Sequence, residues 1–113
     1  MIYALHQFHY TDELVRDINA GTAPEAQAAV GRLMMTRAEN AQETVNAARG
    51  YMTHVADIIA NNLDNAFEIG NIGPESNILR HDQMSSVSVG NVLVDEDGVA
   101  NVVCGWGFAE VDF

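Results

Sequence analysis

The sequence predicts an α+β fold, in which a small antiparallel sheet packs on two or three helices from the middle of the chain. Three observations support this prediction: the N-terminal residues alternate like a strand, the middle has a helical period, and from Met84 the apolar period becomes two. We expect the N-terminal strand and the C-terminal hairpin to form the sheet. At 113 residues the chain is long enough for one modest core, so residues 1–113 are assigned to a single domain.

The N-terminal stretch is predicted to be a strand that is followed by a short helix. Residues 1–10 alternate between two faces, and one of these carries Ile2, Ala4, His6 and Phe8. Thr11 suits the N-cap of the helix because its hydroxyl can accept a hydrogen bond from a backbone N–H. Gly21 suits the position that ends the helix.

The longest predicted element is a helical tract from Thr22 to Ala66. Thr22 suits its N-cap, Pro24 its first turn, and Glu25 completes a capping box. Beyond them the apolar residues repeat every seven positions, which predicts a seam between paired helices. One heptad position holds Met34, Ala41, Ala48 and Val55, and the other holds Ala38, Val45, Met52, Ile59 and Ala66.

The length of this tract bears on its structure. About 40 residues of helix would span about 60 Å, whereas a compact domain of this size is only about 35 Å across. Asn40 followed by Glu43 is a second capping pattern, so two helices with a break near Glu39–Asn40 are predicted. The seam then pairs the helices within one chain, or it joins two copies into a homo-oligomer through the surface from Met34 to Ile59.

The C-terminal part reads as a hairpin and a last strand. A polar connection from Asn71 to Asp82 contains the turn signal Gly73-Pro74. Strand residues follow at Val87, Val89, Val92 and Val94. Asp95 to Gly98 is predicted to be a hairpin turn, with Val99 to Cys104 as the return strand. Gly105-Trp106-Gly107 forms a corner before a final strand from Phe108 to Phe113.

This C-terminal stretch carries a family resemblance. It contains Ser86-Val87-Ser88-Val89-Gly90-Asn91-Val92, then Asp97-Gly98, then Gly107-Phe108. The pattern resembles the S-x-S-V-G-D-V … D-G … G-F ending of small proteins common in bacteriophage genomes and mobile elements. This chain departs from it at Ser85, where arginine is usual, and at Asn91, where aspartate is usual. The resemblance implies a phage-type protein and assigns no activity; physically, Gly90 and Gly98 favour a structural role for the motif.

Composition excludes several function classes. The net charge is −11, with five arginines and no lysine, which argues against nucleic-acid binding. No apolar run approaches a membrane span and no leader opens the chain, so a cytoplasmic protein is expected, in the host cytoplasm if it is phage-encoded. Cys104 is the single cysteine, and its apolar neighbours favour a buried, inert thiol.

No catalytic or metal-binding constellation is recognisable. His6 and His9 lie three apart in a strand and therefore point to opposite faces. His54 is at helical spacing from Asp57, which favours a helix surface, and His81 lies in a loop. We therefore expect no metal, no cofactor and no phosphate loop or nucleophile elbow, and a non-enzymatic role is favoured over an enzyme.

The candidate interaction residues are Trp106, Tyr3, Arg80, Met34, Ala41, Ala48 and Met52. Trp106 is expected to close the core between sheet and helices, the alternative being an exposed anchor for a partner. The leading function is a small acidic accessory protein, phage-type, which acts through protein–protein contacts and self-association. The alternative is a small-molecule or nucleotide binder with a pocket between helices and sheet near Trp106, Tyr3 and Arg80.

Overall fold

A computed structural model describes residues 1–113 and confirms the α+β class. Six antiparallel strands form one sheet in the order β3-β2-β1-β4-β5-β6. The strands are β1 (Ile2–Phe8), β2 (Met52–Ile59), β3 (Ile78–Arg80), β4 (Val92–Val94), β5 (Ala100–Val103) and β6 (Phe108–Val111). The helices are α1 (Asp12–Ala20), α2 (Pro24–Leu33), α3 (Ala41–Ala48) and α4 (Leu63–Ile72), and short 3-10 turns cover 38–40, 49–51 and 75–77. As predicted, the N-terminal strand pairs with the C-terminal hairpin, through β1 and β4.

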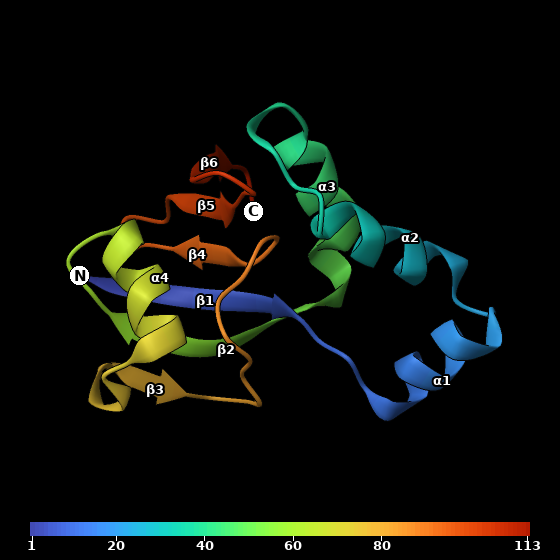
Figure 1. Ribbon diagram of the computed structural model, residues 1–113, viewed down its shortest axis with the longest axis horizontal. Helices are drawn as coiled ribbons and strands as arrows, with labels where there is room; N and C mark the ends of the chain where they lie inside the picture. Colours follow the sequence, from blue (N-terminus) through green and yellow to red (C-terminus); the bar gives the residue numbers. More distant parts are fainter.

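The sheet is covered by different helices on its two faces. Helix α4 lies across the strands β1 and β2 (Figure 1) and packs Ala66 and Ile69 on a core that includes Leu5, Ile58 and Leu93. A second core lies under α3 on the opposite face, over the other half of the sheet. It contains Ala41, Val45, Val92, Ala100, Val102, Cys104 and Val111. No helix covers the half of this second face that belongs to β1, β2 and β3, where the Phe113 ring packs against His6 with centroids 4.8 Å apart.

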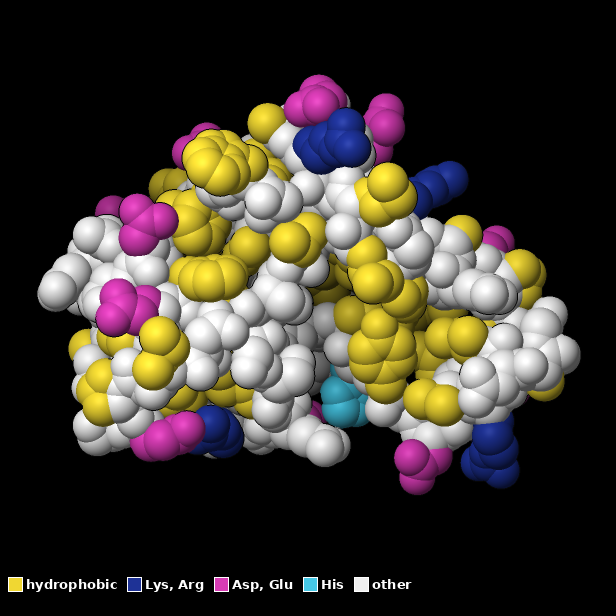
Figure 2. Space-filling view, in the orientation of Figure 1, with side chains coloured by type: hydrophobic (Ala, Val, Ile, Leu, Met, Phe, Trp, Pro, Cys, Tyr) yellow, Lys and Arg dark blue, Asp and Glu magenta, His cyan; other side chains and the backbone are white.

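Helices α1 and α2 lie beside the end of the sheet (Figure 1), where hydrophobic side chains gather (Figure 2). The ring of Phe8 contacts those of Tyr10 and Tyr51, with centroids 4.9 and 5.2 Å apart. Ala29 and Leu33 of α2 complete this small cluster. The predicted N-cap is confirmed, since the Thr11 hydroxyl accepts a hydrogen bond from the N–H of Leu14, and Gly21 ends α1. Helix α2 begins at Pro24 after Ala23, not after Thr22.

The prediction of helix from Thr22 to Ala66 is wrong at residues 52–59, whereas its end from Leu63 to Ala66 belongs to α4. Residues 52–59 form β2, which pairs with β1 on one side and β3 on the other. The segment is rich in β-branched residues, which fit a pleated surface: Thr53, Val55, Ile58 and Ile59. The break near Glu39–Asn40 is confirmed, because α2 ends at Leu33 and α3 begins at Ala41.

The predicted heptad seam is therefore not one continuous surface, and the self-association predicted through it stays a prediction. Ala41, Val45 and Ala48 are buried in the chain's own core. Met34, by contrast, is 72% exposed and Ile59 is 53% exposed. The residues of the seven-residue repeat belong to several helices and a strand, and many of them are buried within the chain.

The strand predicted from Val87 to Val94 is shorter in the structure. Residues 83–91 form an irregular segment, and only Val92–Val94 are strand. A buried amide pair ties this segment to β1: the Gln7 side chain exchanges hydrogen bonds with the backbone of Ser85 and donates to Asn91 Oδ1. Asn91 Oδ1 also accepts from the N–H of Ser88. The motif that carries the family resemblance thus has a structural role here.

The polar connection predicted from Asn71 to Asp82 is not simply a loop, because it contains β3 (Ile78–Arg80), which pairs with β2. The hairpin and the last strand are confirmed. In the hairpin turn, the Asp95 carboxylate accepts hydrogen bonds from the N–H groups of Asp97 and Val99. The return strand is β5 and the last strand is β6. None of the helices has the combination of length and apolar character that crossing a membrane requires.

Candidate functional site

The most distinctive surface is the uncovered face of β1, β2 and β3. Strand register places Ile2 opposite Ile59, Ala4 opposite Asp57, and His6 opposite His54, while Asp57 also pairs with Leu79. Alternate residues Tyr3 and Leu5 point to the α4 side. We call this surface the open face and define it by the following residues. They are Ile2, Ala4, His6, His54, Asp57, Ile59, Leu79 and His81.

A β-bulge brings two of its polar residues together. Leu5 pairs with Ala56 but His6 pairs with His54, so Val55 is an extra residue in β2. In a regular strand, residues three apart face opposite sides of the sheet. The bulge shifts the alternation by one residue, so His54 and Asp57 lie on the same face.

The same bulge positions His81. The carbonyl of Val55 accepts hydrogen bonds from the N–H groups of His81, at 2.8 Å, and Asp82, at 3.2 Å. His81 follows β3 directly, and β3 is itself paired with β2 through Leu79 and Asp57. The chain after β3 is therefore held against the bulged residue, with the His81 ring over the open face.

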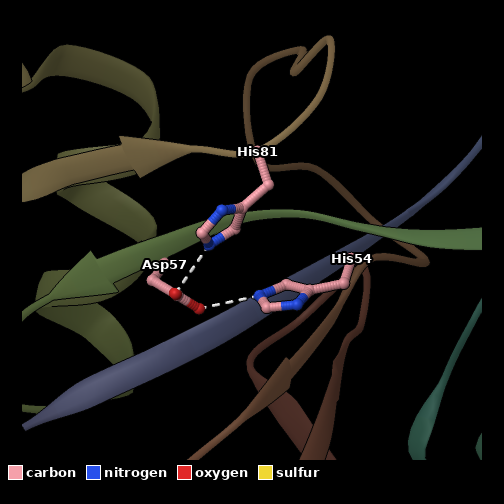
Figure 3. A group of neighbouring side chains, drawn as sticks. All are labelled: His54, Asp57 and His81. Atoms are coloured by element: carbon pink, nitrogen blue, oxygen red, sulfur yellow. Dashed lines mark hydrogen bonds and ion pairs between the residues drawn. The ribbon is translucent and has the colours of Figure 1, made fainter.

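The three side chains converge on one carboxylate (Figure 3). His54 Nε2 lies 2.7 Å from Asp57 Oδ1, and His81 Nε2 lies 2.7 Å from Asp57 Oδ2. The rings of His54 and His81 are 4.9 Å apart. The ring of His6, in β1, stacks on the ring of His54, in β2, with centroids 5.1 Å apart. We call His54, Asp57 and His81 the histidine–aspartate cluster.

Electrostatics in the cluster favours an ionised carboxylate. Burial alone would raise the pKa of Asp57, but the hydrogen bonds from His81 and His54 and their positive charge lower it below its ordinary value. Burial lowers the pKa of His6, and the charge of His54 acts in the same direction. The cluster remains reachable from solvent, since the side chains of His54, Asp57 and His81 are 41%, 27% and 39% exposed.

The cluster offers two imidazole nitrogens and a carboxylate oxygen, all within 4.8 Å of one another. Such a set can hold a divalent metal ion or share protons among its members. Cys104 takes no part in it: the thiol is buried under α3, and burial together with the charge of Glu39 raises its pKa.

The largest surface hollow lies elsewhere. A wide, open hollow of about 1110 Å³ between α2 and α3 is lined mainly by polar residues, among them Arg32, Arg37, Glu39 and Glu43. None of the cluster residues and none of the predicted interaction residues lines it.

Trp106 does not close the core, so that prediction is wrong. It is 93% exposed at the corner between β5 and β6. The N–H of Gly105 donates to the carbonyl of Thr36 and ties the corner to the segment before α3. The ring is therefore exposed, as the alternative prediction requires, and its role as an anchor for a partner stays a prediction.

The predicted pocket near Trp106, Tyr3 and Arg80 does not form. Tyr3 is buried on the α4 side, with 4% of its surface exposed, and Arg80 forms an exposed ion pair with Glu75. Arg80 belongs to β3, at one edge of the sheet, whereas Trp106 adjoins β6 at the other edge. Among the other candidates, Ala41 and Ala48 are buried, Met52 is half-buried, and Met34 is exposed.

The histidine–aspartate cluster was missed by sequence reasoning because residues 52–59 were assigned to a helix. His54 and Asp57 are three apart, a spacing that faces one side of a helix and opposite sides of a regular strand. The available signal was the β-branched content of the segment, which indicates a strand. No pattern in the sequence predicts the bulge.

Comparisons with protein-family models, curated proteins and solved structures find no match to this chain.

Proposed function

We propose that this protein is a non-enzymatic accessory protein that works through protein–protein contacts, and that its open face docks a second copy of the same chain. The observation that carries the proposal is an uncovered sheet face with apolar residues where solvated strands usually carry polar ones. Ile2, Ile59 and Leu79 are 46%, 53% and 63% exposed. An antiparallel sheet with one solvated face normally alternates apolar and polar residues, so this face is suited to being covered.

The charge distribution supports a second copy as the occupant. The chain has sixteen acidic residues, and only Asp57 and Glu110 lie within strands. Glu110 pairs with Asn101, which pairs with Leu93 of the α4-side core, so it lies on that side. The open face therefore carries one carboxylate, which is hydrogen-bonded to two histidines. Two copies with a net charge of −11 repel each other over most of their surfaces and least over this face.

The size of the open face indicates a weak dimer. Strands β1 and β2 are about 24–27 Å long and the three-residue β3 is about 10 Å long, so at a spacing of about 4.8 Å they give a footprint of roughly 290 Å². Functional patches on monomers are about 300–600 Å², whereas stable interfaces bury about 800 Å² per partner. Interfaces this small are typical of weak, transient complexes, so we expect the dimer to dissociate on dilution.

The motif resemblance supports the phage-type assignment of this accessory role. Its residues from Ser85 to Asn91 hold the chain against β1 through Gln7, which is structural work. This arrangement places no reactive group of the motif at the open face. The contact surface and not the motif is therefore the functional part of the proposal.

Sedimentation or light scattering across the micromolar range tests the proposal. The wild-type chain should shift from monomer to dimer with concentration, and Ile59→Glu or Leu79→Glu should remain monomeric because each places a carboxylate on the open face. Ile72→Glu is the matched control, since Ile72 is 82% exposed on α4, away from this face. A wild-type chain that stays monomeric at high micromolar concentration would refute the proposal. Dissociation by Trp106→Ala, with Ile59→Glu still dimeric, would move the interface to the β5–β6 corner and also contradict it.

A further inference from the structure

We infer that His54, Asp57 and His81 form a binding site for a borderline transition-metal ion of the Zn²⁺ type, with one coordination position left to an exchangeable ligand. All three ligands come from one chain, so the site forms in the monomer, although it lies on the open face that we propose docks a second copy. It rests on donor chemistry, on distances, and on the way in which the backbone holds the ligands.

The donor atoms are close to the positions that a metal requires. Zinc lies about 2.0–2.1 Å from imidazole nitrogen and about 2.0–2.2 Å from carboxylate oxygen, so tetrahedral ligand atoms are about 3.3 Å apart. The donors of the cluster lie within 4.8 Å of one another, and each Nε2 is 2.7 Å from a carboxylate oxygen. Rotation of side chains alone can close a difference of this size, because all three side chains are partly exposed.

The backbone pre-organises the ligands. His54 and Asp57 lie on β2, which is paired on both sides, and His81 is fixed by the hydrogen bond from its N–H to the Val55 carbonyl. His6 packs against the ring of His54 and restricts its rotation. Sites that are built on paired strands lose less conformational entropy on binding than sites on mobile loops.

The donor set selects the class of metal. Two imidazoles and one carboxylate suit Zn²⁺ and neighbouring first-row ions, whereas Ca²⁺ and Mg²⁺ require oxygen ligands. One divalent cation also satisfies both imidazoles and the carboxylate at once.

The fourth position is open to solvent. Three protein ligands with a free position are typical of zinc sites that bind water or an exchangeable donor, whereas structural zinc sites have four protein ligands. The exposure of the cluster on the open face leaves room for such a ligand. Because protons compete with the metal for imidazole nitrogens, its affinity should fall as the pH is lowered.

Titration of the tag-free chain with Zn²⁺, by calorimetry and by competition with a chromogenic chelator, tests the inference. One ion should bind per chain, Co²⁺ should give the visible absorption bands of a four-coordinate site, and millimolar Ca²⁺ or Mg²⁺ should not compete. His54→Gln, His81→Gln and Asp57→Asn should each weaken binding by at least about 10–100-fold, the loss typical even of outer-shell changes at metal sites. His9→Gln is the matched control, because His9 lies outside the cluster, whereas the other remaining histidine, His6, stacks on His54.

Thermal melts separate loss of binding from loss of folding. Zn²⁺ should raise the melting temperature of the wild-type chain and of His9→Gln, but not that of the cluster variants, which should melt normally without metal. Ile59→Glu should bind Zn²⁺ like the wild type, whatever its oligomeric state. Absence of saturable binding, or equal weakening by His9→Gln and His81→Gln, would overturn the inference and leave the cluster as an ion pair.

Discussion

Substitution of Gly70 by alanine should destabilise the protein, although alanine is the better helix former. Gly70 lies in α4, and a Cβ at this position would be 2.2 Å from Val87 Cγ2 and 3.1 Å from Val87 Cβ. Carbon atoms in contact are normally about 3.5–4.0 Å apart, so the helix or the segment 83–91 must move. Overpacking of this kind costs up to about 3 kcal/mol. Alanine regains about 1 kcal/mol in a helix, so Gly70→Ala should lower the free energy of unfolding by about 2 kcal/mol.

Two further variants make this experiment specific. Gly31 occupies the same place in α2 as Gly70 in α4, the third residue from the end of a ten-residue helix, and a Cβ there meets nothing within 4 Å. Gly31→Ala should therefore stabilise the protein by about 1 kcal/mol. A Val87→Ala background removes the Cγ2 contact at 2.2 Å and leaves only the Cβ contact at 3.1 Å, so Gly70→Ala should there be close to neutral. The effect of Gly70→Ala then differs by about 2 kcal/mol between the two backgrounds.

Urea unfolding followed by far-ultraviolet circular dichroism measures these differences. The low-micromolar range keeps self-association out of the measurement. If Gly70→Ala stabilises the wild-type chain as much as Gly31→Ala does, Val87 does not pack on α4 and the account of this core is wrong.

Four further outcomes follow from the structure. Gly90→Ala should lower the free energy of unfolding in urea by at least about 2 kcal/mol, because φ is +92° and the added Cβ would lie 2.9 Å from the Cβ of Leu33. Gly98→Ala should lower it by only about 1–2 kcal/mol, because φ is +82° but no atom lies within 4 Å of the added Cβ. Trp106→Ala should change the free energy of unfolding by less than about 0.5 kcal/mol, since the ring is exposed; a large loss in a thermal melt would contradict this placement. Cys104 should resist alkylation in the native state, since burial raises its pKa and limits access, and should react on unfolding, as mass spectrometry can show. Duplex DNA and RNA should not bind at physiological salt, and a sub-micromolar shift in fluorescence anisotropy would disprove this.

Local signals made much of the fold predictable. Thr11 begins α1, Asp95 organises the hairpin turn, and alternation identifies β1, because each of these features depends on residues a few positions apart. Interactions between residues a few positions apart do not decide whether 52–59 is a helix or a strand. Its apolar residues fit a heptad repeat that continues from α3, and they fit a buried strand equally well.

The candidate site was beyond local reasoning for a related reason. Trp106 could be assigned to a corner but not to the inside or the outside of the protein, because exposure depends on what packs there. His54 and His81 are separated by most of a helix, a turn and a strand, and only the pairing of β2 with β3 brings them to one carboxylate.

The sequence by itself determined the α+β class, the N-terminal strand, the capped first helix and the C-terminal hairpin, because short-range hydrogen bonds and side-chain alternation specify them. Only the tertiary structure decided that residues 52–59 are a strand, since the partners of their backbone groups lie in β1 and β3. The register of β1 and β2 also created the bulge at Val55, and this bulge turned His54 toward Asp57. The open face and its cluster therefore arise from long-range pairing, which no stretch of the chain encodes alone.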